Sequence, residues 1–124
     1  MEFYRCKHCG NIIAYVKKSG VAVVCCGEPM QQISENTVDA AHEKHIPNIS
    51  REGMKIKIQV GSVAHPMEAA HYIEWIAIET TNGNQRKVLM PGDKPEAEFY
   101  VAEDTKITKA YAYCNLHGLW SIEL

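Results

Sequence analysis

Two pairs of cysteines near the N-terminus have the residue type and spacing that favour metal binding. Cys6 and Cys9 form a Cys-x-x-Cys motif, whose turn lets two thiolates reach one ion, and the stretch "AVVCCGEPM" places Cys25 directly beside Cys26. Neighbouring side chains of a regular strand point to opposite faces, so the second pair shares an ion only if the backbone bends there. The glycine and proline that follow supply bending residues. Four thiolates suit zinc or iron, and a disulfide framework is the third alternative.

A second group of metal-ligating residue types lies outside this N-terminal segment. The Cys-x-x-His of "YCNLHGLW" lets two side chains face one ion, and it needs partners from elsewhere in the chain. The motifs "AAHEKHIPN" and "VAHPMEAAHY" offer further histidines beside prolines that favour loops. A mixed shell of imidazole and thiolate suits iron, copper or zinc, and the number of ligands is left open by the spacing. The candidates in these motifs are His42, His45, His65, His71, Cys114 and His117.

Short strands separated by turns are the elements that must position these side chains. In about the first 35 residues, "NIIAYV" and "VAVV" are predicted to form a hairpin through a Lys-Lys-Ser-Gly turn. A segment this small cannot bury enough apolar surface to fold alone, which favours a structural metal. The polar stretch "MQQISENTVDAAHEKHIPNISREG" is predicted to be a linker and a loop. Beyond it, strands and an Asn82-Gly83 hairpin turn predict an antiparallel β-sandwich. The expected strands are "MKIKIQVGSV", "HYIEWIAIET", "QRKVLM", "EAEFYVAE", "KITKAYAYC" and "LWSIEL".

Length, charge and hydropathy narrow the classes of protein. The chain has 124 residues and a net charge of −2, which suits one domain with a small appendage. A pI near 6.3 lacks the basic character of a nucleic-acid-binding protein. No apolar run approaches the roughly 20 residues that span a membrane, and the N-terminus lacks a signal-peptide pattern. We therefore expect a cytoplasmic protein without membrane or nucleic-acid partners, in which clustered thiols stay reduced and hold metal.

Taken together, the motifs resemble those of the desulfoferrodoxin family, the two-iron superoxide reductases, over essentially the whole chain. The N-terminal cysteine pattern is similar to a desulforedoxin-type domain. The segments "SENTVDAAHEKHIP", "GSVAHPMEAAHYIEW" and "YCNLHGLW" are similar to the superoxide reductase motifs. The resemblance implies an all-β protein with a desulforedoxin-like iron domain at residues 1–36. An immunoglobulin-like β-sandwich would then occupy residues 37–124.

The same resemblance implies two iron ions per chain. The first iron would be tetrahedral with four thiolates, and the second would have four equatorial imidazoles, an axial thiolate and one open position. Glu43 would fill the open position in the ferric resting state, and Lys44 would lie next to it. His8 and His42 match no ligand of the family. The implied ligands are Cys6, Cys9, Cys25 and Cys26 for the first iron, and His45, His65, His71, Cys114 and His117 for the second.

The activity that the resemblance implies is the one-electron reduction of superoxide to hydrogen peroxide without release of dioxygen. The electrons would come from an external donor such as rubredoxin, and the chain would form a homodimer. Because the whole protein is slightly negative, a local positive field at Lys44 must attract the superoxide anion. The alternatives are a rubredoxin-like electron-transfer protein and a zinc-binding structural or nucleic-acid module. The second His and Cys cluster and the near-neutral pI argue against the module.

Overall fold

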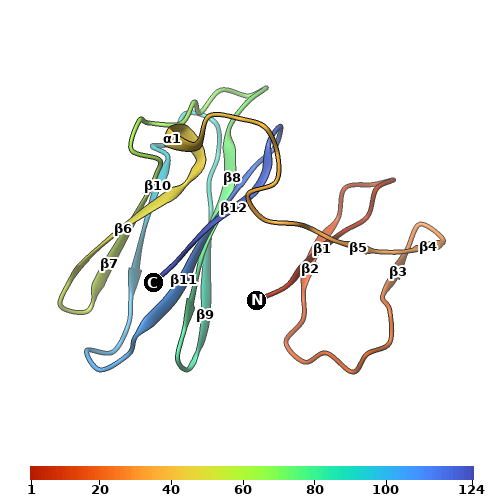
Figure 1. Cartoon of the computed structure of the whole chain (residues 1–124), viewed down its shortest axis with the longest axis horizontal. Coiled ribbons are helices and arrows are strands. Elements are labelled where there is room, and N and C mark those ends of the chain that lie inside the picture. The colour runs from red at the N-terminus through yellow and green to blue at the C-terminus, as the bar shows by residue number, and fades with distance from the viewer. The chain divides into compact units, whose positions relative to one another are not determined.

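The computed structural model describes all of residues 1–124, and the chain divides into two compact units, Met1–Ser34 and Glu35–Leu124 (Figure 1). Every sheet is antiparallel, and the only helix is the single turn α1 (His42–His45). No helix is long and apolar enough to span a membrane. The predicted fold class, an all-β chain with a small N-terminal unit and a larger antiparallel unit, is confirmed.

The first unit consists of two very small sheets. The three-stranded sheet has the order β2-β1-β5 and contains β1 (Phe3–Arg5), β2 (Ile12–Ala14) and β5 (Gln31–Gln32). The two-stranded sheet pairs β3 (Val24–Cys25) with β4 (Glu28–Pro29). The buried apolar residues of the first unit are Phe3, Cys6 and Met30. So small a core contributes little stability, as expected for a unit that depends on a metal.

The predicted hairpin between "NIIAYV" and "VAVV" is wrong. Strand β2 pairs with β1 instead, in the register Tyr4↔Ile13, and Val24 pairs with Pro29. The valines of the intervening segment lie in solvent, with exposed fractions of 107% for Val16 and 75% for Val21. A β-rich composition alone does not fix strand pairing, because pairing depends on a face that can be buried.

The second unit is a sandwich of one three-stranded and one four-stranded sheet. The three-stranded sheet has the order β10-β7-β6 and contains β6 (Pro47–Glu52), β7 (Lys55–Val60) and β10 (Glu96–Tyr100). The four-stranded sheet has the order β12-β11-β8-β9 and contains β8 (Ile73–Thr80), β9 (Gly83–Val88), β11 (Ile107–Cys114) and β12 (Gly118–Glu123). All six predicted strands of this unit are present, whereas β6 and α1 fall in the stretch predicted to be linker and loop. Strand β6 escaped the prediction because it is an edge strand, with only Pro47 fully buried.

The core of the second unit fills the space between its two sheets. Alternate residues of β7 point inward, and Ile56 and Ile58 are both 0% exposed. Each such side chain contributes about 1.5–3 kcal/mol on full burial. Phe99 of β10 and Cys114 at the end of β11 belong to the same cluster and are also fully buried. One of the predicted metal ligands is therefore anchored in the hydrophobic core.

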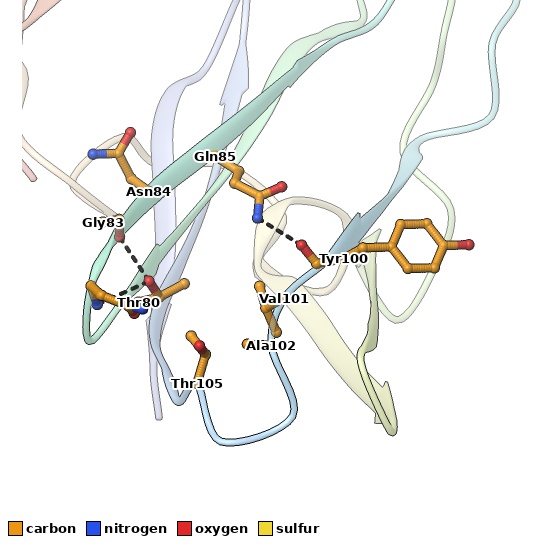
Figure 2. A pocket seen from close by; sticks show the side chains of 9 residues that line it. Thr80, Gly83, Asn84, Gln85, Tyr100, Val101, Ala102 and Thr105 are labelled. Atoms are coloured by element: carbon orange, nitrogen blue, oxygen red, sulfur yellow. Dashed lines mark hydrogen bonds between the residues drawn. The ribbon is translucent and has the colours of Figure 1, made fainter.

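The turn between β8 and β9 lies at the end of the sandwich opposite α1 (Figure 1). Thr80 pairs with Gly83, so the two turn residues are Thr81 and Asn82, one position earlier than the predicted Asn82-Gly83 turn. Figure 2 shows a hollow of about 290 Å³ beside this turn, where Gln85 Nε2 donates to the carbonyl oxygen of Tyr100 at 2.9 Å. No carboxylate, imidazole or thiol lines this hollow. It has no metal-ligating group, and the candidate chemistry lies elsewhere.

Candidate metal centres

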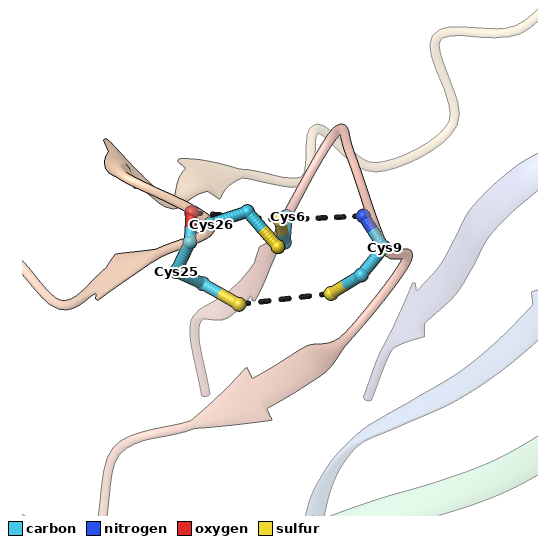
Figure 3. A group of neighbouring side chains, drawn as sticks. All are labelled: Cys6, Cys9, Cys25 and Cys26. Carbon is cyan, nitrogen blue, oxygen red and sulfur yellow. Dashed lines mark hydrogen bonds between the residues drawn. The ribbon is translucent and has the colours of Figure 1, made fainter.

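Four thiols of the first unit converge on one point (Figure 3). Their sulfur atoms lie within 4.8 Å of one another, and Cys9 Sγ is 3.6 Å from Cys25 Sγ. A tetrahedral shell with metal–sulfur bonds of about 2.3 Å places its sulfurs about 3.8 Å apart. All four thiols are free, so no disulfide competes with a metal. The sulfur atoms of Cys6, Cys9, Cys25 and Cys26 therefore fit a single tetrahedral ion.

A tight turn explains how two adjacent cysteines face the same ion. Cys25 pairs with Glu28, which leaves Cys26 and Gly27 as the two residues of the hairpin turn. Both have left-handed backbones, with φ of 52° at Cys26 and 77° at Gly27. Two-residue hairpins of type I′ need positive φ at both positions, and a non-glycine residue there costs about 1–3 kcal/mol. This turn is the bend that the adjacent pair required, and Pro29 lies beyond it in β4.

Ionisation of the four thiols also points to a bound cation. The backbone N–H of Cys9 donates to the sulfur of Cys6 at 3.5 Å, and this bond lowers the pKa of Cys6 to about 6. By contrast, the neighbouring sulfurs of Cys6 and Cys9 raise the pKa of Cys26 to about 12. The sulfur of Cys9 likewise raises the pKa of Cys25. Four thiolates this close are stable only with a cation among them, which is the chemistry of an iron or zinc tetrathiolate.

The second cluster gathers side chains from the helical turn α1, the connection between β7 and β8, the end of β11 and the turn that follows β11. His45 ends α1, two histidines come from the connection between β7 and β8, and Cys114 ends β11. The ligand atoms of four residues lie within 4.8 Å of one another, and these residues are His45, His65, His71 and Cys114. His117 completes the group, since its Nδ1 lies 3.0 Å from His45 Nε2 and 3.9 Å from Cys114 Sγ. All five residues that the sequence suggested for this centre are brought together.

Hydrogen bonds fix which nitrogen of two rings faces the cluster. His45 Nδ1 donates to the carbonyl oxygen of Ala41 at 2.7 Å, and His65 Nδ1 donates to that of Pro66 at 2.7 Å. Each Nε2 is then left with a lone pair, yet the two Nε2 atoms lie only 3.1 Å apart. Two lone pairs facing each other at this distance repel unless a cation lies between them. A carbonyl behind each imidazole is also the usual support of a histidine that binds metal.

The ring of His71 gives the plainest sign of a missing partner. Its Nε2 is the one buried side-chain nitrogen or oxygen of the chain without a hydrogen bond. Leaving such an atom unsatisfied costs about 1–3 kcal/mol. A metal ion at the centre of the cluster would accept this lone pair. The four imidazoles and the thiol therefore fit a metal ion on the observed contacts alone.

Burial favours the neutral form of three of the imidazoles, which is the form that binds a metal ion. Burial lowers the pKa of His65 to about 4, and it also lowers the pKa values of His45 and His71. Burial raises the pKa of the Cys114 thiol, which the N–H groups of Leu116 and His117 partly oppose by donating to its sulfur. A cation would complete the ionisation of that thiol.

Glu43 precedes the candidate ligand His45 by two residues, and its backbone is tightly held. Its carbonyl oxygen accepts hydrogen bonds from the N–H of Val63 at 2.9 Å and from Ser62 Oγ at 3.3 Å. Its side chain is exposed, and its carboxylate is not among the clustered ligand atoms. The assignment of Glu43 as a ligand of the ferric state stays a prediction.

Lys44 is exposed on α1, directly before His45. Burial is the largest cause of the lowered pKa of His71, and the Lys44 ammonium lowers this pKa as well. The charge of Lys44 therefore lies within electrostatic reach of the cluster. His8 and His42 belong to neither cluster. His8 Nε2 lies 3.2 Å from a carboxylate oxygen of Glu28, and the ring of His42 packs edge-on against Trp120.

Comparison with known proteins covers nearly the whole chain. The family described as "Desulfoferrodoxin" matches residues 37–123, and "Desulfoferrodoxin, N-terminal domain" matches residues 1–33. A desulfoferrodoxin homolog of Archaeoglobus fulgidus is 51% identical over 120 residues, which cover 97% of this chain and 94% of that protein. A desulfoferrodoxin of Nitratidesulfovibrio vulgaris is 48% identical, covering 98% of this chain and 95% of that protein. The crystal structure of the superoxide reductase from Treponema pallidum has a TM-score of 0.83 and 38% identity, covering 98% of each chain.

Proposed function

The chain belongs to the desulfoferrodoxin family, and we propose from this premise that it is a superoxide reductase. Its reaction adds one electron and two protons to superoxide and yields hydrogen peroxide. The observation that carries this function is the convergence of four imidazoles and one buried thiol in the second unit. The solved structure that it resembles over 98% of both chains is a superoxide reductase.

An iron ion held by the second cluster would supply the single electron that the reduction requires. We propose that the four histidines and Cys114 would hold this iron. The rings bind through lone pairs because burial lowers the pKa values of three of them, which keeps these rings neutral. Four neutral rings and one thiolate leave a divalent ion with one net positive charge, which favours an anionic substrate. The proposed ligands of this centre are His45, His65, His71, Cys114 and His117.

Lys44 and Glu43 divide two electrostatic tasks in this proposal. The Lys44 ammonium adds positive charge beside the centre and attracts superoxide, although the protein as a whole carries a net charge of −2. It also stabilises negative charge that develops on the product. The Glu43 carboxylate offsets the additional positive charge that remains after the electron has been given up. Both side chains are exposed on the same short turn, which supports these roles.

The first unit would hold the first iron of the chain, the one with four thiolates. The four-sulfur geometry and the family both support a tetrathiolate iron, which can carry one electron. Its proposed ligands are Cys6, Cys9, Cys25 and Cys26. We further propose that residues 1–36 and 37–124 act as separate iron domains, and that an external carrier such as rubredoxin reduces the catalytic centre. A homodimer in the cytoplasm completes the proposal, and these last features rest on the family resemblance and on the reduced thiols.

The decisive test is the balance of products. The iron-loaded chain, with a chemical reductant present, should convert superoxide to hydrogen peroxide without releasing dioxygen. A dismutase would instead release dioxygen amounting to half of the superoxide consumed. The measurement is a dioxygen electrode reading alongside a peroxide assay, and dioxygen release at the dismutase ratio would refute the proposal. A chain that transfers electrons from its tetrathiolate iron but leaves superoxide untouched would favour the electron-carrier alternative.

A further inference from the structure

Asn115 connects two segments that carry proposed metal ligands. One segment contains Cys114 at the end of β11, and the other contains His71 just before β8. The Oδ1 of Asn115 accepts a hydrogen bond from the N–H of Tyr72 at 2.9 Å, and its Nδ2 donates to the carbonyl oxygen of Ala70 at 3.0 Å. Its own N–H donates to the carbonyl oxygen of Tyr72 at 3.2 Å. These three bonds hold the chain on both sides of His71. We propose that Asn115 is a positioning residue that sets His71 against the other ligands, an inference that rests on the proposed metal centre.

His71 needs such support more than His45 and His65 do. The rings of His45 and His65 are each oriented by a bond from Nδ1 to a backbone carbonyl, and the ring of His71 makes no such bond. The backbone of His71 is instead paired with Glu68 through two hydrogen bonds of 3.0 and 2.9 Å. This pairing closes a small loop on itself and does not tie it to the rest of the centre. The position of the His71 ring therefore depends on what holds the loop from outside.

The pairing of β11 with β8 does not by itself set the position of His71 relative to Cys114. The pairing of β11 with β8 shifts between Tyr113 and Cys114, and Cys114 opposite Ile73 is the last pair of the ladder. An irregularity of this kind bends the strand directly before Cys114, so the pairing of the preceding residues does not by itself set the register of the residues that follow. The bonds between Asn115 and Tyr72 continue the connection one step beyond the ladder. They are placed where they can correct the register of His71 relative to Cys114.

Loss of these bonds should affect metal binding more than folding. A single hydrogen bond contributes about 0.5–1.5 kcal/mol to stability, so removing the Asn115 side chain costs the fold only modestly. Removing a residue that orients a metal ligand lowers metal affinity about 10- to 100-fold. The two effects separate a positioning role from a structural one.

Asn36 offers a matched control in the same unit. Its Oδ1 accepts from the N–H of Ser121 at 2.9 Å, and its Nδ2 donates to the carbonyl oxygen of Ser121 at 3.3 Å. Asn36→Ala thus removes a similar pair of side-chain bonds from a bridge that touches no proposed ligand. Because Asn36 has a φ of 55°, its replacement should cost the fold at least as much as Asn115→Ala does.

The experiment measures the cobalt(II) affinity of the full chain by competition with a chelator. The absorption that Cys114→Ser removes reports the second centre alone, and the remaining thiolate absorption reports the first. Asn115→Ala should lower the affinity of the second centre about 10- to 100-fold and leave the first unchanged. Asn36→Ala should change neither by more than about 2-fold. If Asn115→Ala folds poorly, Asn115→Asp, which keeps the acceptor for Tyr72, makes the same comparison.

A double-variant comparison tests whether Asn115 acts through His71. In a His71→Ala background, the further change Asn115→Ala should leave cobalt affinity within about 2-fold, because the ligand to be positioned is gone. Equal affinities of Asn115→Ala and Asn36→Ala would overturn the inference. The inference would also be overturned if Asn115→Ala lowered the cobalt affinity as much in the His71→Ala background as it does in the wild-type chain. A wild-type chain without any Cys114-dependent absorption would instead refute the metal centre itself, and the inference with it.

Discussion

Gly61→Ala should disturb the short turn that carries Glu43 and Lys44. A Cβ atom at Gly61 would lie 2.4 Å from the carbonyl oxygen of Glu43 and 2.9 Å from the carbonyl carbon of Lys44. Ordinary contacts begin near 3.4 Å, so the backbone must move by about 1 Å, and overpacking of this kind typically costs about 1–3 kcal/mol. The two hydrogen bonds that the Glu43 carbonyl accepts would stretch with this movement.

The effect of Gly61→Ala on function depends on the residues of this turn, which are Glu43, Lys44 and His45. His45 is held by its own bond to the carbonyl of Ala41, so metal binding should largely survive the change. Glu43 and Lys44 would move together relative to the centre. We expect superoxide capture to slow roughly 2- to 10-fold, as for the loss of a steering charge. The assay combines pulse-radiolysis rates for superoxide with thermal unfolding of the iron-loaded chain.

Gly53→Ala is the control for this prediction. Gly53 has a φ of 63° and nothing within 4 Å of an added Cβ, so the substitution costs backbone strain without a clash. It lies in the turn between β6 and β7, and a loss of stability there should leave the rate unchanged. An unaltered rate and stability in Gly61→Ala, or an equal fall in rate in Gly53→Ala, would refute the reasoning.

Further predictions concern the two charged side chains and the first centre. Glu43→Ala should preserve catalysis and alter the visible spectrum of the oxidised protein, and an unchanged spectrum would show that Glu43 is not a ligand. Lys44→Ala should slow superoxide capture roughly 2- to 10-fold at low ionic strength and less at high salt; equal rates at low salt would remove the steering role. Cys26→Ser should abolish the tetrathiolate absorption and leave the Cys114-dependent band intact, as read from the visible spectrum, and simultaneous loss of both bands would contradict two independent centres.

The sequence predicted the two clusters of candidate ligands better than it predicted the strand pairing of the small unit that contains four of these residues. The Cys and His motifs carry their own spacing, and the inward alternation of β7 reflects a face that is truly buried. The predicted hairpin within residues 11–24 is wrong because the valines of this segment have no core to cover them. Strand β6 was missed because an edge strand with one buried residue has no clear alternation.

The residues that support the ligands were not predictable in the same way. Asn115 stands inside the Cys-x-x-His motif, but its partners at residues 70 and 72 are over 40 positions away. Gly61 is distinguished only by its contact with the backbone of Glu43, which no local pattern reveals. Such contacts depend on how loops meet at the end of the sandwich. The sequence motifs and the family resemblance therefore predicted the side chains that the structure brings together, and the structure was needed to find what holds them.

The most direct test of two iron centres is the visible spectrum of the protein purified without added metal, before and after chemical oxidation. Tetrathiolate iron bands, together with a further thiolate band that appears on oxidation and is lost in Cys114→Ser, would match the account. Metal analysis of the same sample should then give iron in both centres. A colourless protein in both states, or a second band that survives Cys114→Ser, would contradict the assignment of Cys114 as the thiolate of a redox-active iron.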